Sequence, residues 1–452
     1  MTGTRKLFGT DGIRGMADAF PLDRDTTFYI GRALGHYLSR THQQPRVVIG
    51  EDTRESSRWI AERVASGLAT AGVQAQSAGV ITTPGVAFLA RTHDFAAGIV
   101  ISASHNPWTD NGIKVFAHDG YKLSDAAELE IEREIFSLIA GGSPPIAATT
   151  TLEADRRLHL DYVKWLLSSV DASYLQGITV VVDCANGAAS TLAAEVFRAC
   201  GVKGFFTHQN PDGRNINEVC GALHPEVVAR EVVARGATLG VTFDGDADRC
   251  LFADSAGNVI NGDALLLLVA RYLSDADKLT GETVVATTMS NMGLEAALRK
   301  SGIKMLRAPV GDKYVLEEML KTGAVLGGEQ SGHIIFRDGD ATTGDGLLTA
   351  LRVLEIIGRR GQTLPELIAD LKVFPQVIKN VRVREKKPLL EIPEVAGAIR
   401  EAERQLDGNG RVVVRYSGTE ALARVMIEAE SEATMTKFAD SIAGAIEKAL
   451  GA

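Results

Sequence analysis

The sequence predicts an α/β fold of three similar domains with mixed sheets around a central cleft, followed by a smaller C-terminal α+β domain. Three observations predict it: a unit of helices and strands recurs three times, each unit carries a polar loop between two apolar strands, and the last segment has another order of elements. Alternating helices and strands favour a sheet covered by helices. The chain has 452 residues, 45% of them hydrophobic, enough for several buried cores.

The first half of each unit predicts a helix, a short strand and a second helix. The first helices are expected at Thr26–Leu38, Leu158–Val170 and Asp263–Leu273, and the strands at Val47–Gly50, Ile178–Asp183 and Thr283–Thr288. The second helices should begin at polar turns with good N-cap residues near Ser57, Ser190 and Ser290 and end at Gly72, Gly201 and Gly302.

The second half of each unit predicts two apolar strands joined by a polar loop. The first of these strands are expected at Gly98–Ile101, Leu239–Phe243 and Ala324–Leu326, and the second should end at Phe116, Phe252 and Phe336. The polar loops are residues 104–107, 244–249 and 328–333. Ligand sites of open α/β sheets gather beyond the carboxyl ends of strands, so the three loops are expected to face one cleft.

These patterns place four domains at residues 1–155, 156–258, 259–371 and 372–452. The last of them reads as strand, helix, two strands and helix, which is typical of a small α+β domain.

Composition narrows the class of partner. The net charge of −9 disfavours nucleic acid or an anionic membrane as the main partner. The four cysteines lie far apart in sequence, as expected of reduced thiols. The N-terminal residues form no apolar signal core, and the longest apolar run, Ala264–Ala270, is far too short to cross a bilayer. We therefore expect a cytoplasmic protein.

Asp244, Asp246 and Asp248 alternate along a loop that contains glycine. Carboxylates in this arrangement can converge on one hard cation, Mg²⁺ or Ca²⁺. An EF-hand loop is excluded, because its sixth and twelfth positions would be Arg249 and Ser255 rather than glycine and glutamate. The loop therefore predicts a divalent metal site.

Ser104 precedes His105 and Asn106 in a context that differs from the G-x-S-x-G motif of hydrolases. Neighbours on an extended chain point to opposite faces, so His105 is expected to be a poor base for Ser104. A phosphoserine carries two negative charges near neutral pH and would need a cation beside three aspartates. Phosphorylated Ser104 is thus expected to join the aspartates as a fourth metal ligand.

Two more motifs suit a phosphorylated sugar, although each alone is equally typical of a polar turn. Glu329 and Ser331 offer an acceptor and a hydroxyl for sugar hydroxyl groups, and Arg415 with Ser417, Gly418 and Thr419 resembles an anion nest, with Arg424 just beyond. Residues 8–15 are rich in glycine but lack the G-x-G-x-x-G spacing, and the chain has no Walker A motif. This argues against a dinucleotide or ATP enzyme.

Taken in this order, the four loops resemble those of the α-D-phosphohexomutases over essentially the whole chain. The resemblance implies that Ser104 is a phosphoserine and that Mg²⁺ is bound by its phosphate with Asp244, Asp246 and Asp248. It assigns sugar binding to Glu329 and Ser331 and phosphate binding to Arg415, Ser417, Gly418, Thr419 and Arg424. Arg14 would lie in an N-terminal active-site loop, while Arg249 and Lys114 would steady the transferring phosphate. His333 and Lys114 both remain candidates for the general acid and base, Lys114 only if its pKa is lowered.

Residues 8–15, 215–217, 220–221, 224–226 and 289–294, together with Gln330, resemble the amino-sugar branch of this family. That likeness implies interconversion of glucosamine 6-phosphate and glucosamine 1-phosphate through a bisphosphate, with glucose or glucosamine 1,6-bisphosphate as primer. The product would feed UDP-N-acetylglucosamine and cell-wall synthesis. The alternatives are a phosphomannomutase or phosphoglucomutase, a metal-dependent phosphatase, and a non-catalytic phosphosugar-binding phosphoprotein.

Three residues depart from the usual pattern of the family: Tyr416 and Ala421 stand where relatives tend to have proline, and Trp108 where tyrosine is commoner. Loss of proline would loosen the phosphate loop but removes no anion donor. The oligomeric state stays open, with a homodimer as one option.

Overall fold

The computed structural model describes residues 5–142, 150–416 and 421–451. The chain divides into two compact units, which are described separately. The first contains Met1–Met289 and Leu306–Leu367, and the second contains Ser290–Met305 and Ile368–Ala452.

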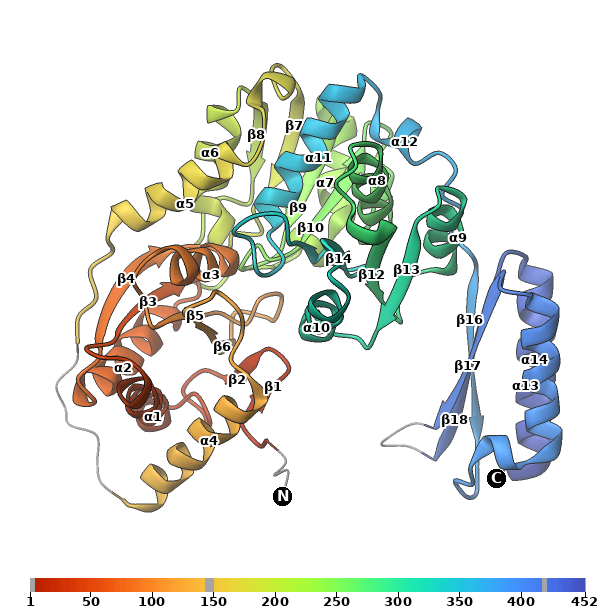
Figure 1. The fold of residues 1–452 in the computed structure, drawn as a ribbon, viewed down its shortest axis with the longest axis horizontal. Helices are drawn as coiled ribbons and strands as arrows, with labels where there is room; N and C mark the ends of the chain where they lie inside the picture. The colour runs from red at the N-terminus through yellow and green to blue at the C-terminus, as the bar shows by residue number, and fades with distance from the viewer. Residues whose placement is uncertain (1–4, 143–149, 417–420, 452) are drawn as a thin grey trace. The chain divides into compact units, whose positions relative to one another are not determined.

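The first sheet of the larger unit has six strands in the order β1-β2-β6-β5-β3-β4 (Figure 1). Its strands are β1 (Phe8–Gly9), β2 (Gly12–Met16), β3 (Arg46–Glu51), β4 (Gln74–Val80), β5 (Ala97–Ile101) and β6 (Asp110–Ala117). β3 runs parallel to β4 and β5, whereas β6 is antiparallel to β5 and β2. The accompanying helices are α1 (Arg24–Thr41), α2 (Ser57–Thr70), α3 (Thr83–Thr92) and α4 (Asp125–Ala140). Side chains of α1, α2 and β3 form one buried apolar core with those of α4.

The second sheet has five strands in the order β11-β10-β9-β7-β8. They are β7 (Thr179–Asp183), β8 (Lys203–Thr207), β9 (Leu239–Phe243), β10 (Cys250–Asp254) and β11 (Val259–Ile260), with helices α5 (Arg156–Ser168), α6 (Ala193–Ala199) and α7 (Pro225–Arg235). Here β7 is parallel to β8 and β9, and β10 is antiparallel to β9. The four cysteines of the chain are all buried, with free thiols.

The third sheet has the order β13-β12-β14-β15. Its strands are β12 (Thr283–Thr287), β13 (Lys304–Ala308), β14 (Leu326–Gly328) and β15 (Ile334–Phe336), and the helices beside it in sequence are α8 (Gly262–Asp275), α10 (Asp312–Thr322), α11 (Gly346–Arg360) and α12 (Leu364–Leu367). β14 is parallel to β12 and antiparallel to β15.

One strand order therefore occurs three times, as β4-β3-β5-β6, β8-β7-β9-β10 and β13-β12-β14-β15. This confirms the repeated unit and the mixed sheets that the sequence predicts. In the three repeats, β5, β9 and β14 run parallel to β3, β7 and β12, respectively. The carboxyl end of each of these strands leads into one of the three polar loops, and the chain then returns as the antiparallel strand β6, β10 or β15. The three loops thus occupy equivalent positions.

Two local details differ from expectation. β4, β8 and β13, and the helices α3, α7 and α10 that follow them, were not anticipated, because short strands with mixed burial lack a clear period. The predicted N-cap is confirmed near Ser290, where the side chain of Asn291 caps α9 (Met292–Lys300), whereas Ser56 and Leu192 occupy the N-cap positions of α2 and α6 without a side-chain hydrogen bond. The glycine stops are confirmed, since Gly72, Gly201 and Gly302 all have φ between 75° and 77°.

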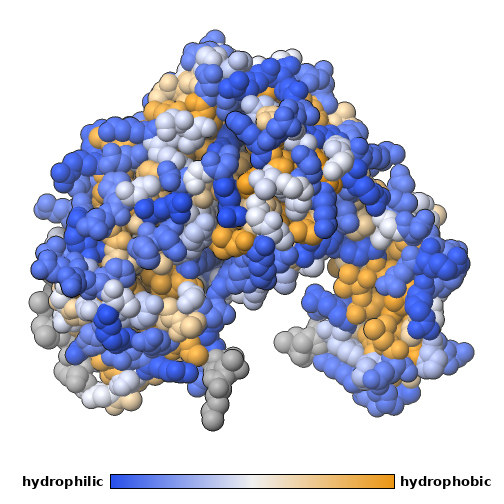
Figure 2. All heavy atoms as spheres, in the orientation of Figure 1, coloured by the Kyte–Doolittle hydropathy of each residue, from blue (hydrophilic) through white to orange (hydrophobic). Residues whose placement is uncertain are grey.

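The smaller unit contains α9 and the predicted order of strand, helix, two strands and helix. These are β16 (Gln376–Arg382), α13 (Pro393–Leu406), β17 (Gly410–Tyr416), β18 (Leu422–Ala429) and α14 (Glu432–Leu450). The sheet order is β16-β18-β17, fully antiparallel, and α13 and α14 lie side by side against it (Figure 1). Figure 2 shows apolar residues gathered over this part of the chain, where the sheet and helices share one core.

Short 3-10 helices complete the described segments: η1 (Ala172–Tyr174), η2 (Ala188–Thr191), η3 (Gly221–Leu223), η4 (Thr280–Glu282) and η5 (Leu389–Glu391). None of the helices in the described ranges has both the length and the apolarity that crossing a bilayer requires.

Candidate active site

Ser104 lies in the loop between β5 and β6, named here the Ser104 loop (residues 102–109). Its backbone is left-handed, with φ of 52°, and its N–H donates to Ser102 Oγ at 2.9 Å. Ser102 Oγ in turn donates to Asp52 Oδ2 at 2.7 Å. A non-glycine residue in this conformation is strained and needs its surroundings to hold it.

Arg54 holds the path of the Ser104 loop from within. Its Nε donates to Asp52 at 2.8 Å, and both side chains are fully buried. Its two terminal nitrogens donate to four backbone carbonyls of the loop and its end: Nη2 to Ser104 and Asn106 at 2.9 Å each, and Nη1 to Asp110 at 3.0 Å and to Pro107. The paired guanidinium therefore fixes the main chain around Ser104.

The side chain of Ser104 meets the aspartates of the loop between β9 and β10, named here the aspartate loop (residues 244–249). Ser104 Oγ donates to Asp244 Oδ2 at 2.5 Å across 140 residues of sequence. Carboxylate oxygens of Asp244, Asp246 and Asp248 all lie within 4.8 Å of one another, and the three residues are buried. The structure thus brings together the four residues that the sequence predicted as metal ligands.

The chemistry of these carboxylates suits a divalent cation. Asp246 Oδ1 and Asp248 Oδ1 are buried and have no hydrogen-bond partner among the described residues. Buried acceptors are normally satisfied, so two such oxygens in one cluster of carboxylates are consistent with a cation site. Burial, together with Asp248 and Asp246, raises the pKa of Asp244 to about 8. A bound cation would favour the charged form of Asp244 instead.

Lys114, on β6, is enclosed among carboxylates. Its Nζ lies 2.8 Å from Asp246 Oδ2, 3.0 Å from Asp11 Oδ2 and 3.5 Å from Asp248 Oδ2. Burial lowers the pKa of Lys114, but the carboxylates overcome this and raise it well above its ordinary value. These contacts favour the charged form of Lys114 rather than the lowered pKa that proton transfer by Lys114 would need.

His333 offers the better candidate for proton transfer. Its Nδ1 lies 3.7 Å from Asp248 Oδ1 and its Nε2 3.8 Å from Asp312 Oδ2. Burial lowers its pKa, but Asp248 and Asp312 raise it to about 9 in sum. The Gly344 N–H donates to Nε2 at 3.0 Å and favours the neutral ring instead. His333 thus has the opposing contacts of a group that can gain and lose a proton.

His105 differs from expectation. Its Nδ1 lies 3.2 Å from Ser104 Oγ, because the left-handed backbone of Ser104 removes the alternation of an extended chain. The same nitrogen accepts from Arg249 Nη1 at 3.2 Å. Burial, with Arg249 and Arg14, lowers the pKa of His105 to about 4. His105 is close to Ser104, yet it is a weak base.

A cavity of about 440 Å³ opens beside these groups. Its lining includes the predicted residues Arg14, Asp248, Arg249, Glu329 and His333, and also Asp11, His105 and Asp312. Glu329 Oε1 accepts from the Gly311 N–H at 3.0 Å, and Ser331 Oγ donates to Glu329 Oε2 at 3.3 Å. The cavity is polar and combines both signs of charge, as a phosphorylated sugar requires.

Sequence reasoning missed two charged residues that line this cavity, Asp11 and Asp312, and also Lys122, which pairs with both of them. Asp11 accepts from Lys114 and from Lys122 Nζ at 2.6 Å, and Lys122 also reaches Asp312 at 2.6 Å. Asp11 pairs with Arg14, and both lie in the glycine-rich segment 8–15, so this segment could have indicated Asp11 as a site residue. Lys122 and Asp312 stand in no motif, and only the fold brings them together.

The predicted phosphate-binding residues belong to the smaller unit. Arg415 on β17 and Arg424 on β18 face each other in the antiparallel register. Ser417, Gly418 and Thr419 lie outside the described residues, so their role stays a prediction. The hydroxyl of Tyr416 donates to the Lys387 carbonyl at 2.5 Å, which ties the end of β17 to the segment after β16.

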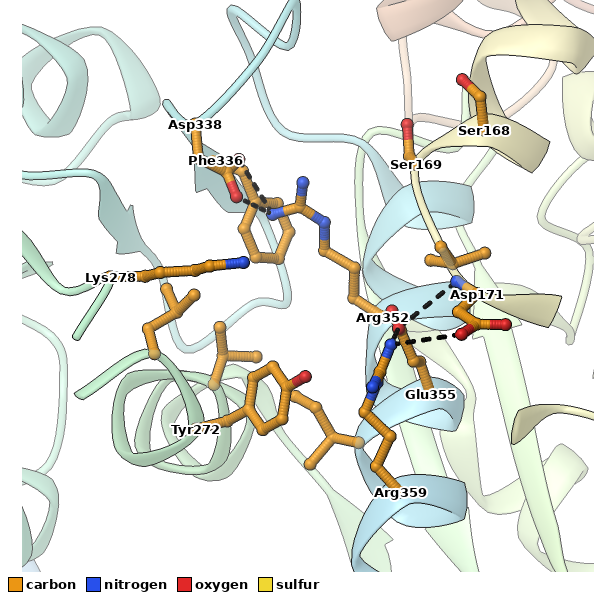
Figure 3. A pocket seen from close by; sticks show the side chains of 14 residues that line it. Ser168, Ser169, Asp171, Tyr272, Lys278, Phe336, Asp338, Arg352, Glu355 and Arg359 are labelled. Atoms are coloured by element: carbon orange, nitrogen blue, oxygen red, sulfur yellow. Dashed lines mark hydrogen bonds and ion pairs between the residues drawn. The ribbon is translucent and has the colours of Figure 1, made fainter. Parts of the chain in front are cut away.

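A second cavity, of about 360 Å³, lies at the end of α5 between α8 and α11 (Figure 3). Its arginines are already compensated: Arg352 pairs with Asp338 at 2.9 Å, and Arg359 pairs with Glu355 at 2.8 Å. Its lining includes none of the residues of the three polar loops. The first cavity is therefore the candidate active site.

Comparison with known proteins agrees with this arrangement. Family models of phosphoglucomutase/phosphomannomutase α/β/α domains I, II and III match residues 5–140, 159–257 and 261–374, and the C-terminal domain model matches residues 378–445. The phosphoglucosamine mutase of Koribacter versatilis is 61% identical over 99% of this chain and 98% of that protein. The phosphoglucosamine mutase of Solibacter usitatus is 54% identical over 99% of each chain.

Solved structures give the same result for the fold. A phosphoglucomutase/phosphomannomutase family protein from Burkholderia thailandensis superposes with a TM-score of 0.79 at 25% identity, covering 98% of this chain and 97% of that one. The N-acetylphosphoglucosamine mutase of Aspergillus fumigatus, solved with GlcNAc-6P and magnesium, gives a TM-score of 0.63 at 18% identity, covering 99% and 96%. The chain therefore belongs to the phosphoglucomutase/phosphomannomutase family and, within it, to the phosphoglucosamine mutases.

Proposed function

We propose that this enzyme interconverts glucosamine 6-phosphate and glucosamine 1-phosphate through phosphorylated Ser104 and a 1,6-bisphosphate intermediate. The observation that carries the proposal is the 2.5 Å contact between Ser104 Oγ and Asp244 beside the polar cavity. Relatives named phosphoglucosamine mutase match this chain over its full length, which supports the choice of an amino sugar.

Asp244, Asp246 and Asp248, with a phosphate on Ser104, are the residues that would hold Mg²⁺. When bound, the ion would neutralise charge on the transferring phosphoryl group. Lys114 would keep the carboxylates in place, and Arg249 and Arg14, which line the cavity, would steady the phosphoryl oxygens.

In the forward half-reaction the bond between phosphorus and Ser104 Oγ breaks as phosphorus bonds to the free hydroxyl oxygen of the sugar. The hydroxyl proton passes to the neutral form of His333, which the Gly344 N–H favours, and Ser104 Oγ keeps the electron pair of the broken bond as an alkoxide. After the bisphosphate turns over, Ser104 Oγ takes the other phosphoryl group and His333 returns its proton to the sugar oxygen. Glu329 and Ser331 would bind sugar hydroxyls, and Arg415, Ser417, Gly418, Thr419 and Arg424 the phosphate that does not react.

The test is to incubate the protein, Mg²⁺ and a trace of glucose 1,6-bisphosphate with glucosamine, glucose and mannose 6-phosphates in turn. We expect glucosamine 1-phosphate as the main product. No 1-phosphate from any sugar would refute the mutase reaction, and a preference for mannose or glucose would refute the amino-sugar assignment. Free phosphate as the main product would identify a phosphatase.

The setting follows from the same proposal. Glucosamine 1-phosphate would feed UDP-N-acetylglucosamine and peptidoglycan precursor synthesis, with glucose or glucosamine 1,6-bisphosphate as the primer of Ser104. A cytoplasmic location fits a metabolic enzyme with a phosphosugar partner, and the net charge of −9 gives no reason to expect a nucleic acid or membrane partner.

A further inference from the structure

Residues 215–217 are among the segments that resemble the amino-sugar branch of the family, yet the proposed reaction gives them no role. They follow β8 in the second sheet, whereas Ser104 follows β5 in the first. In the structure Asn217 Nδ2 donates to the carbonyl of Ser104 at 3.0 Å and to that of Asn106 at 3.3 Å. Asn217 is 8% exposed, so these bonds are shielded from water.

Asn217 and Arg54 donate hydrogen bonds to the same two carbonyl oxygens, although Arg54 precedes these residues in the sequence and Asn217 follows them. Arg54 belongs to the first sheet's segment and reaches both oxygens at 2.9 Å. A carbonyl oxygen has two lone pairs, and on Ser104 and Asn106 both are then used. The aspartate loop completes the enclosure: a β-carbon added at Gly245 would lie 2.4 Å from the Ser104 carbonyl oxygen.

Asn217 and the residue that its N–H contacts, Ala185, both have a left-handed backbone. Asn217 has φ of 59°, and its N–H donates at 2.9 Å to the carbonyl of Ala185, which has φ of 55°. Asp183 Oδ1 accepts from the Ala185 N–H at 2.9 Å, and Asp183 Oδ2 accepts from the Gly221 N–H at 2.9 Å. Left-handed residues held together in this way are typical of functional sites, where the strain is maintained by the surroundings.

From these contacts we propose that Asn217 is a positioning residue that holds the strained Ser104 backbone, and so aims Ser104 Oγ at the metal-binding aspartates. The inference rests on the proposed function. Asn217 touches neither sugar nor metal ligand side chains in this scheme, and it acts through the main chain of Ser104. Its loss should therefore slow phosphoryl transfer and leave sugar binding largely unchanged.

The test compares Asn217→Asp, Asn217→Gly and the matched control Asn215→Asp. Asn217→Asp keeps the shape of the side chain but replaces the donating Nδ2 by an oxygen that faces two carbonyl oxygens. Asn217→Gly removes the side chain while still allowing a left-handed backbone. Asn215 Nδ2 also donates to a carbonyl, that of Asn210 at 3.0 Å, in the same segment but away from Ser104. Its replacement measures the general cost of disturbing this segment.

We expect both Asn217 variants to lose about 10- to 100-fold in kcat, with KM for glucosamine 6-phosphate within about 3-fold of wild type, since small displacements of a reacting group cost this much. Phosphorylation of Ser104 by glucose 1,6-bisphosphate, followed by intact mass, should slow in parallel. Asn215→Asp should stay near wild type.

Four outcomes would overturn the inference: an unchanged kcat, a change confined to KM, an equal loss in Asn215→Asp, or a loss in both Asn217 variants that only parallels a loss of folded protein. A wild-type enzyme that converts none of the sugars would instead refute the proposed function. The two failures are therefore distinguishable.

Discussion

Replacing Lys114 by methionine tests the electrostatics of the candidate site most directly. The change removes one ammonium from among Asp11, Asp246 and Asp248, which lie 2.8 to 3.5 Å from it, and keeps an unbranched apolar chain of similar length. Breaking a buried ion pair by removing one partner costs about 3–5 kcal/mol, because the other charge is left uncompensated. We expect Lys114→Met to lower the free energy of unfolding of the larger unit by about that amount in EDTA.

Mg²⁺ should return part of this loss. A ligand that binds only the folded state stabilises it, and the aspartates of the variant attract a cation more strongly once the ammonium is gone. The gain in stability on adding Mg²⁺ should therefore be larger in Lys114→Met than in wild type. Lowering the pH should also reduce the difference in free energy of unfolding between Lys114→Met and wild type, because protonation removes the uncompensated charge of the carboxylates.

The assay is urea unfolding followed by tryptophan fluorescence, since Trp59, Trp108 and Trp165 all belong to the larger unit. The matched control is Lys122→Met, which breaks pairs with Asp11 and Asp312 at 2.6 Å but removes no contact with Asp244, Asp246 or Asp248. It should be destabilised without the enlarged Mg²⁺ effect. Equal Mg²⁺ gains in all three proteins, or a Lys114 variant as stable as wild type, would refute the reasoning.

Three further predictions concern the reacting groups. Ser104→Ala should abolish turnover and phosphoenzyme formation while urea unfolding stays near that of wild type; near-normal activity would rule out the phosphoserine mechanism. Asp244→Asn should raise the Mg²⁺ concentration for half-maximal activity by at least about 10-fold, as measured by titration after EDTA treatment, and an unchanged titration would exclude Asp244 as a ligand. Gly245→Ala should cost about 1–3 kcal/mol of stability and most of the activity, because its β-carbon would lie 2.4 Å from the Ser104 carbonyl oxygen, whereas Gly339→Ala, with open space around it, should be neutral in both assays.

Much of the fold could be predicted because one pattern of helices and strands occurs three times, so each unit supports the interpretation of the others. The loops that carry Ser104, Asp248 and Glu329 were found for the same reason, since all follow the third strand of a unit. Helix caps were less predictable: a serine near a helix start is common, and which neighbour caps depends on backbone angles that composition does not specify.

The rest of the site depends on contacts between distant segments. Lys122 and Asp312 are 190 residues apart and neither has a distinctive sequence context, so only the folded chain reveals their pairing. The position of His105 was mispredicted because Ser104 adopts a left-handed backbone that sequence assigns by default to glycine. Asn217 belongs to a segment that the sequence marks as similar to the family, but its partners are main-chain carbonyls. Every residue has such a carbonyl, so the sequence does not indicate which ones Asn217 contacts.

The way in which Arg54 binds the Ser104 loop bears on how that loop can change over evolution. Its guanidinium contacts carbonyl oxygens at positions 104, 106, 107 and 110 and no side chain of those residues. The path of the loop is thus insulated from the identity of the side chains along it. Substitutions such as a tryptophan at position 108, whose ring lies 5.1 Å from the Arg214 guanidinium, can alter the outer surface while the reactive serine keeps its place.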